Sequence, residues 1–277
     1  MRPDASVESH HFEALGTSCS LFAVGQPHGR LLEGESWVRR LGARLTRFSE
    51  DSELSQLNRA AGEWVAISDE MEEILSAALR AHAMSAGLVN VAVLPAMLAV
   101  GYTRPLIEGP GVATLESLRP LLPLPDVLEL RDGEARVQDG CGVDLGGIAK
   151  GWMADRLSET LGPNVVVNLG GDLRARGAGP RGAGWPVGLG GATLLLRNQG
   201  AATSSVQRRR WGELHHLIDP RTGSPARTGL EEVSVVAASG FEAEVVAKTA
   251  LLLGPDLAPA YCAAHAMAWW LSGTHDD

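Results

Sequence analysis

The apolar positions in the first hundred residues follow first strand spacing and then helix spacing. Residues 12–24 are rich in β-branched and aromatic residues and are broken by a Gly-Thr step, which predicts an early strand or hairpin. A well-marked helix follows Ser68, a favourable N-cap, and closes at Gly87. Its apolar stripe comprises Met71, Ile74, Leu75, Ala78, Leu79 and His82. An earlier stripe at helical spacing comprises Trp37, Val38, Leu41, Leu45 and Phe48.

The rest of the chain continues this mixture. Five prolines make residues 105–125 a connection with room for a short helix around residues 114–121, and Arg131-Asp132-Gly133 predicts a hairpin turn. Ser239 and Glu242 form a capping box that opens a helix ending near Gly254. Further predicted elements are a helix at about 147–161 and strands at 165–169, 193–196, 233–237 and 267–271. We therefore expect one α+β domain over residues 1–277, a mixed or antiparallel sheet packed with helices in one or two lobes, after a polar extension at residues 1–11.

Charge and hydropathy exclude several classes of protein. The 33 acidic and 24 basic residues give a formal net charge of −9, and the absence of a long basic run disfavours nucleic acid as a partner. No apolar run reaches the roughly 18 residues of a membrane-spanning helix, and the polar first eleven residues lack the apolar stretch of a secretion signal. We expect a cytoplasmic protein with no membrane span. The chain has three widely spaced cysteines, expected to be reduced and mostly buried: Cys19, Cys141 and Cys262.

Lysine and glycine are distributed unevenly. Only two of the 24 basic residues are lysines, Lys150 and Lys248. Glycine contributes 33 residues, and 15 of them lie between residues 140 and 191. This concentration of glycine is where we look for chemistry, because glycine lets a ligand approach the backbone.

The segment DLGGIAKG, from Asp144 to Gly151, places an acidic residue and paired glycines before a helix that carries Lys150 near its start. Exposed N–H groups at a helix start, with a lysine beside them, suit a phosphate or pyrophosphate. The segment matches neither a Walker loop nor a dinucleotide fingerprint. A tight strand-to-helix turn with a solvated lysine explains it equally well.

Two further segments carry candidate groups. In NLGGD, Asn168, Gly170 and Gly171 lie at a strand end where a ligand could approach the backbone, although a glycine pair in a hairpin accounts for them too. After ATSS at residues 202–205, the stretch 208–225 brings two histidines and an Asp-Pro-Arg-Thr-Gly turn. A histidine before such a rigid turn could act as a general base, but a structural role is more common. We expect the three arginines at residues 208–210 to lie on a solvated surface.

Taken in order, these segments resemble the ApbE family of FAD:protein FMN transferases, or flavin transferases. ALGTSCSLF looks like the family's Met-Gly-Thr entry strand, RFSEDSELSQLN like its Ser-Glu-Leu-Ser segment, and GLVNVAV like its Phe-Asp-Pro-Thr-Val segment. DLGGIAKG, NLGGD, ATSS, HLIDPRTG and AEVVAKTALLLG follow at matching positions. The resemblance extends over most of the chain.

The resemblance implies a reaction in which the FMN moiety of FAD is transferred, with magnesium, to a threonine or serine hydroxyl of an acceptor flavoprotein, and AMP is released. His216 matches the base, with Asp219 and Arg221 shaping the loop around it. Phe48 replaces a usual tyrosine, and Asn90 replaces a usual aspartate. The positions that the resemblance assigns to FAD are Leu15, Thr17, Phe48, Leu88, Val89, Asn90, Asp144, Lys150, Asn168, Gly170, Gly171, Ser204 and Ile218.

The metal site departs from the family pattern. Gly147 matches a backbone ligand of magnesium, but Glu244 and Lys248 stand where the family has aspartate and threonine ligands. An ammonium cannot be a ligand and repels a cation at close range. Lys248 therefore either swings out or occupies the place of the metal. The simplest alternative is an i, i+4 ion pair on a helix surface, worth about 0.2 to 0.5 kcal/mol.

Three functional hypotheses follow from the resemblance. The protein is an FMN transferase with weakened or rearranged magnesium binding, an FAD pyrophosphatase that yields FMN and AMP, or a non-catalytic FAD-binding protein. We favour the transferase, because the base and both glycine segments are retained.

Overall fold

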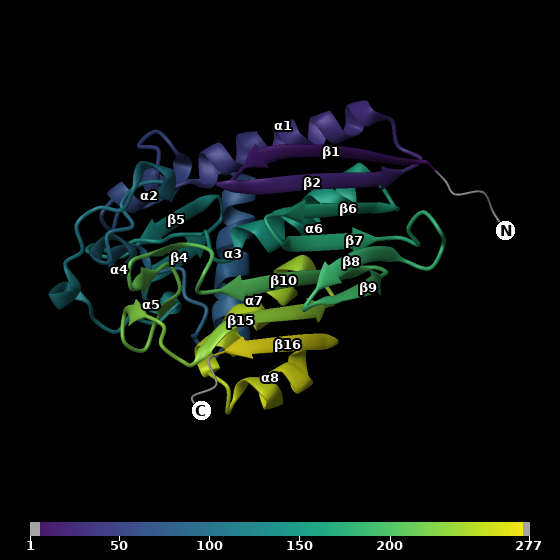
Figure 1. Cartoon of the computed structure of the whole chain (residues 1–277). Helices are drawn as coiled ribbons and strands as arrows, with labels where there is room; N and C mark the ends of the chain where they lie inside the picture. Colours follow the sequence, from purple (N-terminus) through teal and green to yellow (C-terminus); the bar gives the residue numbers. More distant parts are fainter. Residues whose placement is uncertain (1–5, 274–277) are drawn as a thin grey trace.

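The alternating residues near the N-terminus form the first hairpin of a seven-stranded sheet. The computed structural model describes residues 6–273, and every pair of neighbouring strands in this sheet is antiparallel (Figure 1). In spatial order the strands are β1 (Val7–Ala14), β2 (Thr17–Val24), β6 (Val165–Leu169), β7 (Asp172–Arg176), β10 (Gln199–Ser205), β15 (Leu230–Ala237) and β16 (Ala268–Gly273). The predicted α+β class with an antiparallel sheet and packed helices is confirmed.

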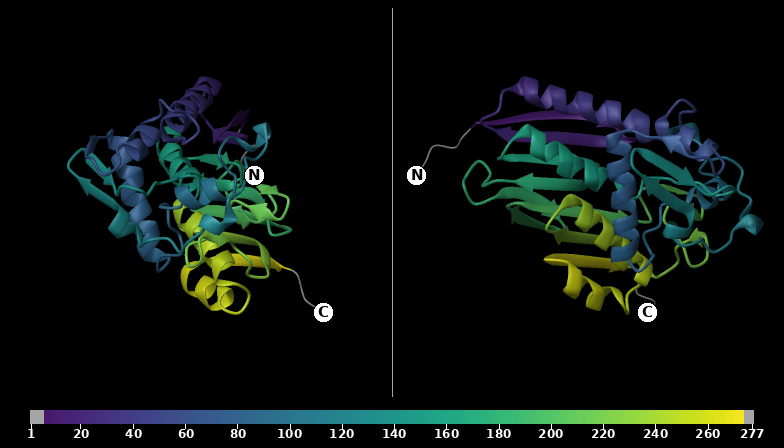
Figure 2. Two further views of the ribbon diagram at one scale, coloured as in Figure 1. Left: turned by 90° about the vertical axis from the view of Figure 1, so that its left-hand side faces the viewer. Right: turned by 180° about the vertical axis from the view of Figure 1, so that it is seen from behind.

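Helices cover one face of this sheet, as the right-hand view of Figure 2 shows. They are α1 (His28–Leu45), α6 (Ala149–Leu161), α7 (Gly240–Leu253) and α8 (Ala258–His265). Helix α3 (Asp69–Met84) runs across the ends of α6 and α7. Between the helices and the sheet lies an extended apolar core. No helix within residues 6–273 is both long and apolar enough to cross a lipid bilayer.

A smaller sheet lies beyond one end of the large one (Figure 1). Its order is β3 (Val65–Ala66), β5 (Glu134–Val137) and β4 (Leu128–Arg131). The helices α2 (Glu53–Arg59), α4 (Leu94–Ala99) and α5 (Leu124–Val127) and the 3-10 turns η1 (Leu106–Glu108) and η2 (Leu115–Ser117) accompany it. Two-stranded ribbons complete the chain: β8 (Trp185–Leu189) with β9 (Ala192–Leu196), β11 (Arg210–Trp211) with β12 (Leu214–His215), and β13 (Ile218–Asp219) with β14 (Ser224–Pro225).

Helices α6 and α7 cap each other where they cross. Asp155 of α6 accepts the backbone N–H groups of Gly240 (2.8 Å) and Phe241 (2.9 Å) at the start of α7. In return, Glu244 of α7 accepts the N–H of Gly151 (2.8 Å) in the first turn of α6. A Cβ at Gly151 would lie 2.5 Å from the carbonyl oxygen of Gly240, so the close crossing requires glycine there. Each carboxylate compensates the positive end of the other helix, and the starts of both helices are held together.

The predicted hairpins and long helices are present, with three corrections at their ends. Helix α1 stops at Leu45 because Thr46 adopts an extended backbone, so Phe48 lies outside the helical stripe. The short helix expected at residues 114–121 is only the 3-10 turn η2, since nearby prolines limit helical hydrogen bonding. Residues 7–11, expected in a polar extension, form part of β1 by pairing with β2, and residues 1–5 of that extension lie outside the described residues. The three cysteines are free.

Candidate active site

Arg47 and Asp144 form a mostly buried ion pair beside the loop that leads into α6. The Nε–H of Arg47 donates to Oδ2 of Asp144 at 2.6 Å, and the N–H of Gly146 donates to Oδ1 at 2.8 Å. The Arg47 side chain is only 4% exposed, and its Nη2 atom has no hydrogen-bond partner within residues 6–273. This leaves a buried guanidinium N–H group that could donate a hydrogen bond to a bound anion.

Three aromatic rings stand next to this pair. The guanidinium carbon of Arg47 lies 4.2 Å from the ring centroid of Phe48 and 4.6 Å from that of Tyr102. The Phe48 and Tyr102 centroids are 5.5 Å apart, and those of Tyr102 and Trp211 are 5.4 Å apart. Phe48 is 40% exposed. These rings therefore form an aromatic wall with a face on which a planar ligand can stack.

Both lysines of the chain lie near the start of α6: Lys150 is in its first turn, and Lys248 reaches it from the middle of α7. Lys150 forms an ion pair with Asp172, at the start of β7, and its Nζ lies 3.8 Å from Oε1 of Glu244. Lys248, one turn after Glu244 on α7, donates a hydrogen bond to the backbone carbonyl of Gly147. Burial lowers the pKa of Lys150 to about 8, and it also lowers the pKa of Lys248, while the Glu244 carboxylate opposes both shifts.

The residues that match a magnesium site do not fit a divalent cation. The Gly147 carbonyl accepts a hydrogen bond from Lys248, and the Glu244 carboxylate accepts the Gly151 N–H and faces Lys150. The third position is an ammonium, which cannot donate an electron pair. Within residues 6–273, no three His, Cys, Asp or Glu side chains come together as a metal-binding group.

His216 is a neutral imidazole next to this cationic cluster. Burial holds its pKa well below the usual value, and the charges of Arg209, Lys248 and Lys150 lower it further. Its Nδ1 atom is buried and has no hydrogen-bond partner in the part of the chain that the structure describes. The neighbouring His215 is structural, because its Nε2 bonds the Ala226 carbonyl oxygen at 2.9 Å. Of these two neighbouring histidines, His216 is therefore the one with a ring nitrogen left for a substrate.

The turn after His216 is held by its own side chains. Asp219 accepts three hydrogen bonds from the Arg221 side chain, at 2.7, 2.9 and 3.1 Å, and its backbone carbonyl accepts the N–H of Gly223 at 2.8 Å. Arg221 also donates to the carbonyl of Leu252 at the end of α7, at 2.7 Å. Asp219 and Arg221 thus fix the loop against α7, the helix that carries Lys248.

The NLGGD segment forms the tight turn between β6 and β7. Asn168 accepts the N–H of Gly171 at 2.8 Å, and Gly170 has a φ of 71°. A Cβ at Gly170 would lie 2.5 Å from the Thr17 side chain, so the turn and the first hairpin approach closely only through glycine. Arg208 donates to the Gly170 carbonyl at 3.0 Å. Arg208 is exposed, but it contacts the turn and is not simply a solvated residue as expected.

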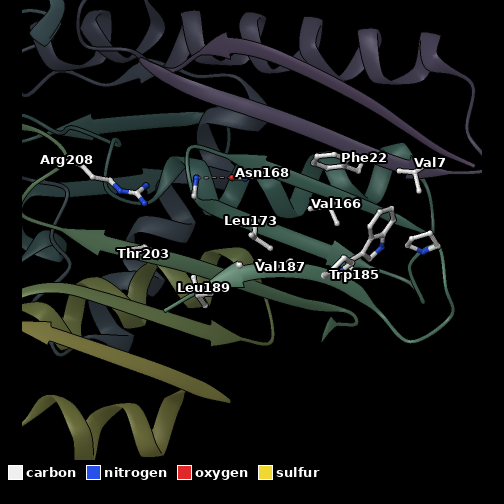
Figure 3. Close-up of a pocket in the computed structure, with 14 residues that line it drawn as sticks. Val7, Phe22, Val166, Asn168, Leu173, Trp185, Val187, Leu189, Thr203 and Arg208 are labelled. Carbon is white, nitrogen blue, oxygen red and sulfur yellow. Dashed lines mark hydrogen bonds between the residues drawn. The ribbon is translucent and has the colours of Figure 1, made fainter. Parts of the chain in front are cut away.

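A pocket of about 440 Å³ begins at this turn, on the face of the sheet opposite the helices (Figure 3). Asn168, Thr203 and Arg208 line its polar end. Phe22, Val166, Leu173 and Trp185 make the other end apolar, with the β8–β9 ribbon beside them. The candidate site therefore has charged groups on the helix side of the turn and an apolar recess on the other side.

Several residues that were predicted to contact FAD use their side chains for packing or for hydrogen bonds within the protein. Val89 and Ile218 are buried in apolar clusters, and Leu88 and Leu15 pack against such clusters. Ser204 is buried on β10 opposite Val233 of β15. The Asn90 amide donates to the Leu122 carbonyl and accepts the Ala92 N–H, both at 2.9 Å. At these positions the side chains pack in the core or form hydrogen bonds within their own loop, and they do not point at the cluster of cations around Lys150 and His216.

The sequence did not single out four residues that the structure brings to the site: Arg47, Tyr102, Trp211 and Arg209. Arg47 directly precedes Phe48, and Arg209 follows Arg208, but nothing in their spacing indicates burial or direction. Tyr102 and Trp211 reach the same wall from distant segments. Only tertiary structure could reveal that meeting.

A model of the ApbE family matches residues 15–270. The chain belongs to the ApbE family. It is 26% identical over 253 residues to the FAD:protein FMN transferase of Haemophilus influenzae, covering 82% of this chain and 73% of that relative. It is 29% identical over 243 residues to a protein of the same name from Klebsiella pneumoniae, covering 78% and 72%.

Solved ApbE structures have the same fold. The flavin transferase ApbE from Vibrio cholerae superposes with a TM-score of 0.82 and 22% identity, over 98% of this chain and 96% of that one. The apo flavinyl transferase ApbE of Pseudomonas stutzeri gives 0.83 and 22%, over 98% and 92%. At 22% identity these superpositions show only that the fold is shared.

Proposed function

We propose that this ApbE-family protein is an FAD:protein FMN transferase. It moves the FMN moiety of FAD to a threonine or serine hydroxyl of an acceptor flavoprotein through a phosphoester bond and releases AMP. The observation that carries the proposal is the family match over residues 15–270, which includes the neutral His216, with its buried Nδ1 atom, beside a cluster of cations.

The residues divide the chemistry between them. The acceptor oxygen attacks the FMN-side phosphorus, an O–P bond forms, the pyrophosphate P–O bond breaks and AMP leaves. His216 takes the hydroxyl proton, which its neutral imidazole can accept at pH 7. Lys150, Lys248 and Arg209, whose charges all act on His216, would neutralise the charge of the pyrophosphate. The aromatic wall at Phe48 gives one ring system of FAD a stacking face.

Magnesium, which the resemblance implies, enters no step of this mechanism, because Gly147, Glu244 and Lys248 do not fit it. The identity of the acceptor is open, and the cytoplasmic location stays a prediction.

The test mixes the protein with FAD and a purified flavoprotein subunit that carries an acceptor threonine, with a Thr→Val version of that subunit as control. We expect a fluorescent, covalently labelled subunit and one AMP per label, and no label on the control. AMP without label would instead support the pyrophosphatase, and bound flavin without turnover would support the non-catalytic FAD-binding protein.

His216→Ala should lower the transfer rate about 10²- to 10⁴-fold while FAD still binds, because only proton transfer is lost. His215→Asn is the matched control, since an amide can still donate to the Ala226 carbonyl. Normal transfer by the His216→Ala variant would end the assignment of His216 as the base.

A further inference from the structure

We infer that the Lys248 ammonium replaces the divalent cation at this site, so that the protein binds FAD and transfers FMN without a metal ion. The inference rests on the proposed function, and it concerns what neutralises the pyrophosphate. It turns on two contacts among residues of α6, α7 and the loop that joins Asp144 to α6, and on the charge of the cluster that these residues form.

The first contact places the ammonium itself. Lys248 donates to the carbonyl oxygen of Gly147, the backbone oxygen that matches a magnesium ligand. A Cβ at Gly147 would lie 2.5 Å from Nζ of Lys248, so the absence of a side chain at this position makes room for the ammonium. A cation is therefore already bonded at the oxygen that a metal would need.

The second contact engages the carboxylate that would otherwise be a metal ligand. Glu244 is 3% exposed and accepts the Gly151 N–H at 2.8 Å, and its other oxygen faces Lys150 at 3.8 Å. It compensates the positive start of α6 and the charge of Lys150. A metal ion would have to compete with both of these bonds.

The third observation is the charge of the cluster. Arg47 is paired with Asp144 and Lys150 with Asp172, while Glu244 faces both lysines. Arg209 adds a further positive charge that acts on both lysines and on His216. Arg208 also acts on Lys150, so three carboxylates stand against five cations and the cluster carries an excess of positive charge. An excess of positive charge suits a pyrophosphate and opposes a divalent cation.

The decisive measurement is FAD affinity, by quenching of flavin fluorescence, in EDTA and in Mg²⁺. For the parent protein we expect the same Kd in both, within about twofold. Lys248→Met should weaken FAD binding about 10- to 100-fold in both, because a hydrogen bond to a charged group is lost. Lys248→Thr should be equally weak in EDTA and recover in Mg²⁺. Arg156→Met, which removes a cation from the exposed side of α6, should leave the affinity unchanged.

Parent protein that loses FAD affinity in EDTA would overturn the inference, and so would a Lys248→Met variant with parental affinity. Circular dichroism melts show whether each variant folds. If Lys248→Met does not fold, titration of the parent with Mn²⁺, followed by electron paramagnetic resonance, decides the question. We expect no Mn²⁺ bound at the site, and stoichiometric Mn²⁺ binding would overturn the inference.

The transfer assay separates the two proposals. Labelling in EDTA supports both of them. Labelling only in Mg²⁺ overturns the role of Lys248 and leaves the transferase standing. Metal-independent FAD binding with no labelling under any condition supports the role of Lys248 and refutes the transferase.

Discussion

The two lysines lie at the same end of the large sheet, on neighbouring helices, but their partners differ. Lys150 is paired with the Asp172 carboxylate and lies near Glu244, whereas the hydrogen bond of Lys248 goes to a neutral carbonyl. Both are partly buried, and the loss of solvent around them lowers the pKa of each. A buried charge is costly unless a partner compensates it. More of the charge of Lys150 is therefore compensated within the fold, and Lys248 keeps more of its charge for a ligand.

The largest stability effect should come from breaking the Lys150 pair. Lys150→Met leaves the Asp172 carboxylate, which is 2% exposed, without its cation. Removing one partner of a buried pair typically costs about 3 kcal/mol or more. We expect the free energy of unfolding in urea to fall by about that amount, and the Lys150→Met/Asp172→Leu double variant to recover part of it. Parental stability of Lys150→Met would show that Asp172 is compensated elsewhere.

The pH dependence of FAD binding tests whether the charges of Lys150 and Lys248 influence each other. Because the pKa of Lys150 is about 8, its ammonium loses its proton as the pH rises through that value, and its attraction for the pyrophosphate is lost. FAD affinity should therefore be flat from pH 6.5 to 7.5 and fall above about pH 8, by up to about tenfold per pH unit for a single proton. Since the charge of Lys248 lowers the pKa of Lys150, Lys248→Met should move this midpoint to higher pH.

A midpoint that stays in place in Lys248→Met would mean that the two ammonium groups do not interact. Arg156→Met serves as the control for a general change in charge, because Arg156 pairs with Glu73 on the exposed side of α6.

The smallest effect is expected for Lys248→Met on stability. This substitution removes a buried charge and leaves only the Gly147 carbonyl without its bond. Replacing buried ionic groups by apolar ones of similar volume is often neutral or stabilising. We expect a change of less than about 1 kcal/mol in the free energy of unfolding. If Lys248→Met lowered the free energy of unfolding as much as Lys150→Met, the two lysines would contribute equally to stability and the comparison would fail.

The secondary structure was predictable where local signals agree with packing. Ser68 accepts the Met71 N–H at 3.3 Å as an N-cap should, and the predicted apolar stripe of α3 faces the core. Phe48 was misplaced because helical spacing continues past Leu45 in the sequence, whereas the backbone turns at Thr46. Spacing cannot show such a turn, since periodicity reports on side chains and not on where the helix ends.

The site was predictable as a set of segments, but not as a set of contacts. DLGGIAKG, NLGGD and the stretch around His216 do supply the central residues. Asn90, however, braces its own loop, and Arg47 itself was assigned no role, although it directly precedes Phe48 in a segment that matches the family. Local motifs name the groups that can do chemistry, and only the packing of distant segments decides which of them point at the same place.

The sequence alone determined the family, the α+β class, the histidine before the turn and the presence of lysine where a metal ligand was expected. It left open whether Lys248 swings out, forms a surface pair with Glu244 or stands in the place of the metal. The tertiary structure decided this, because the crossing of α6 and α7 directs Glu244 to the Gly151 N–H and brings Lys248 to the Gly147 carbonyl. Residues about one hundred positions apart make those bonds, and their direction depends on how two helices pack.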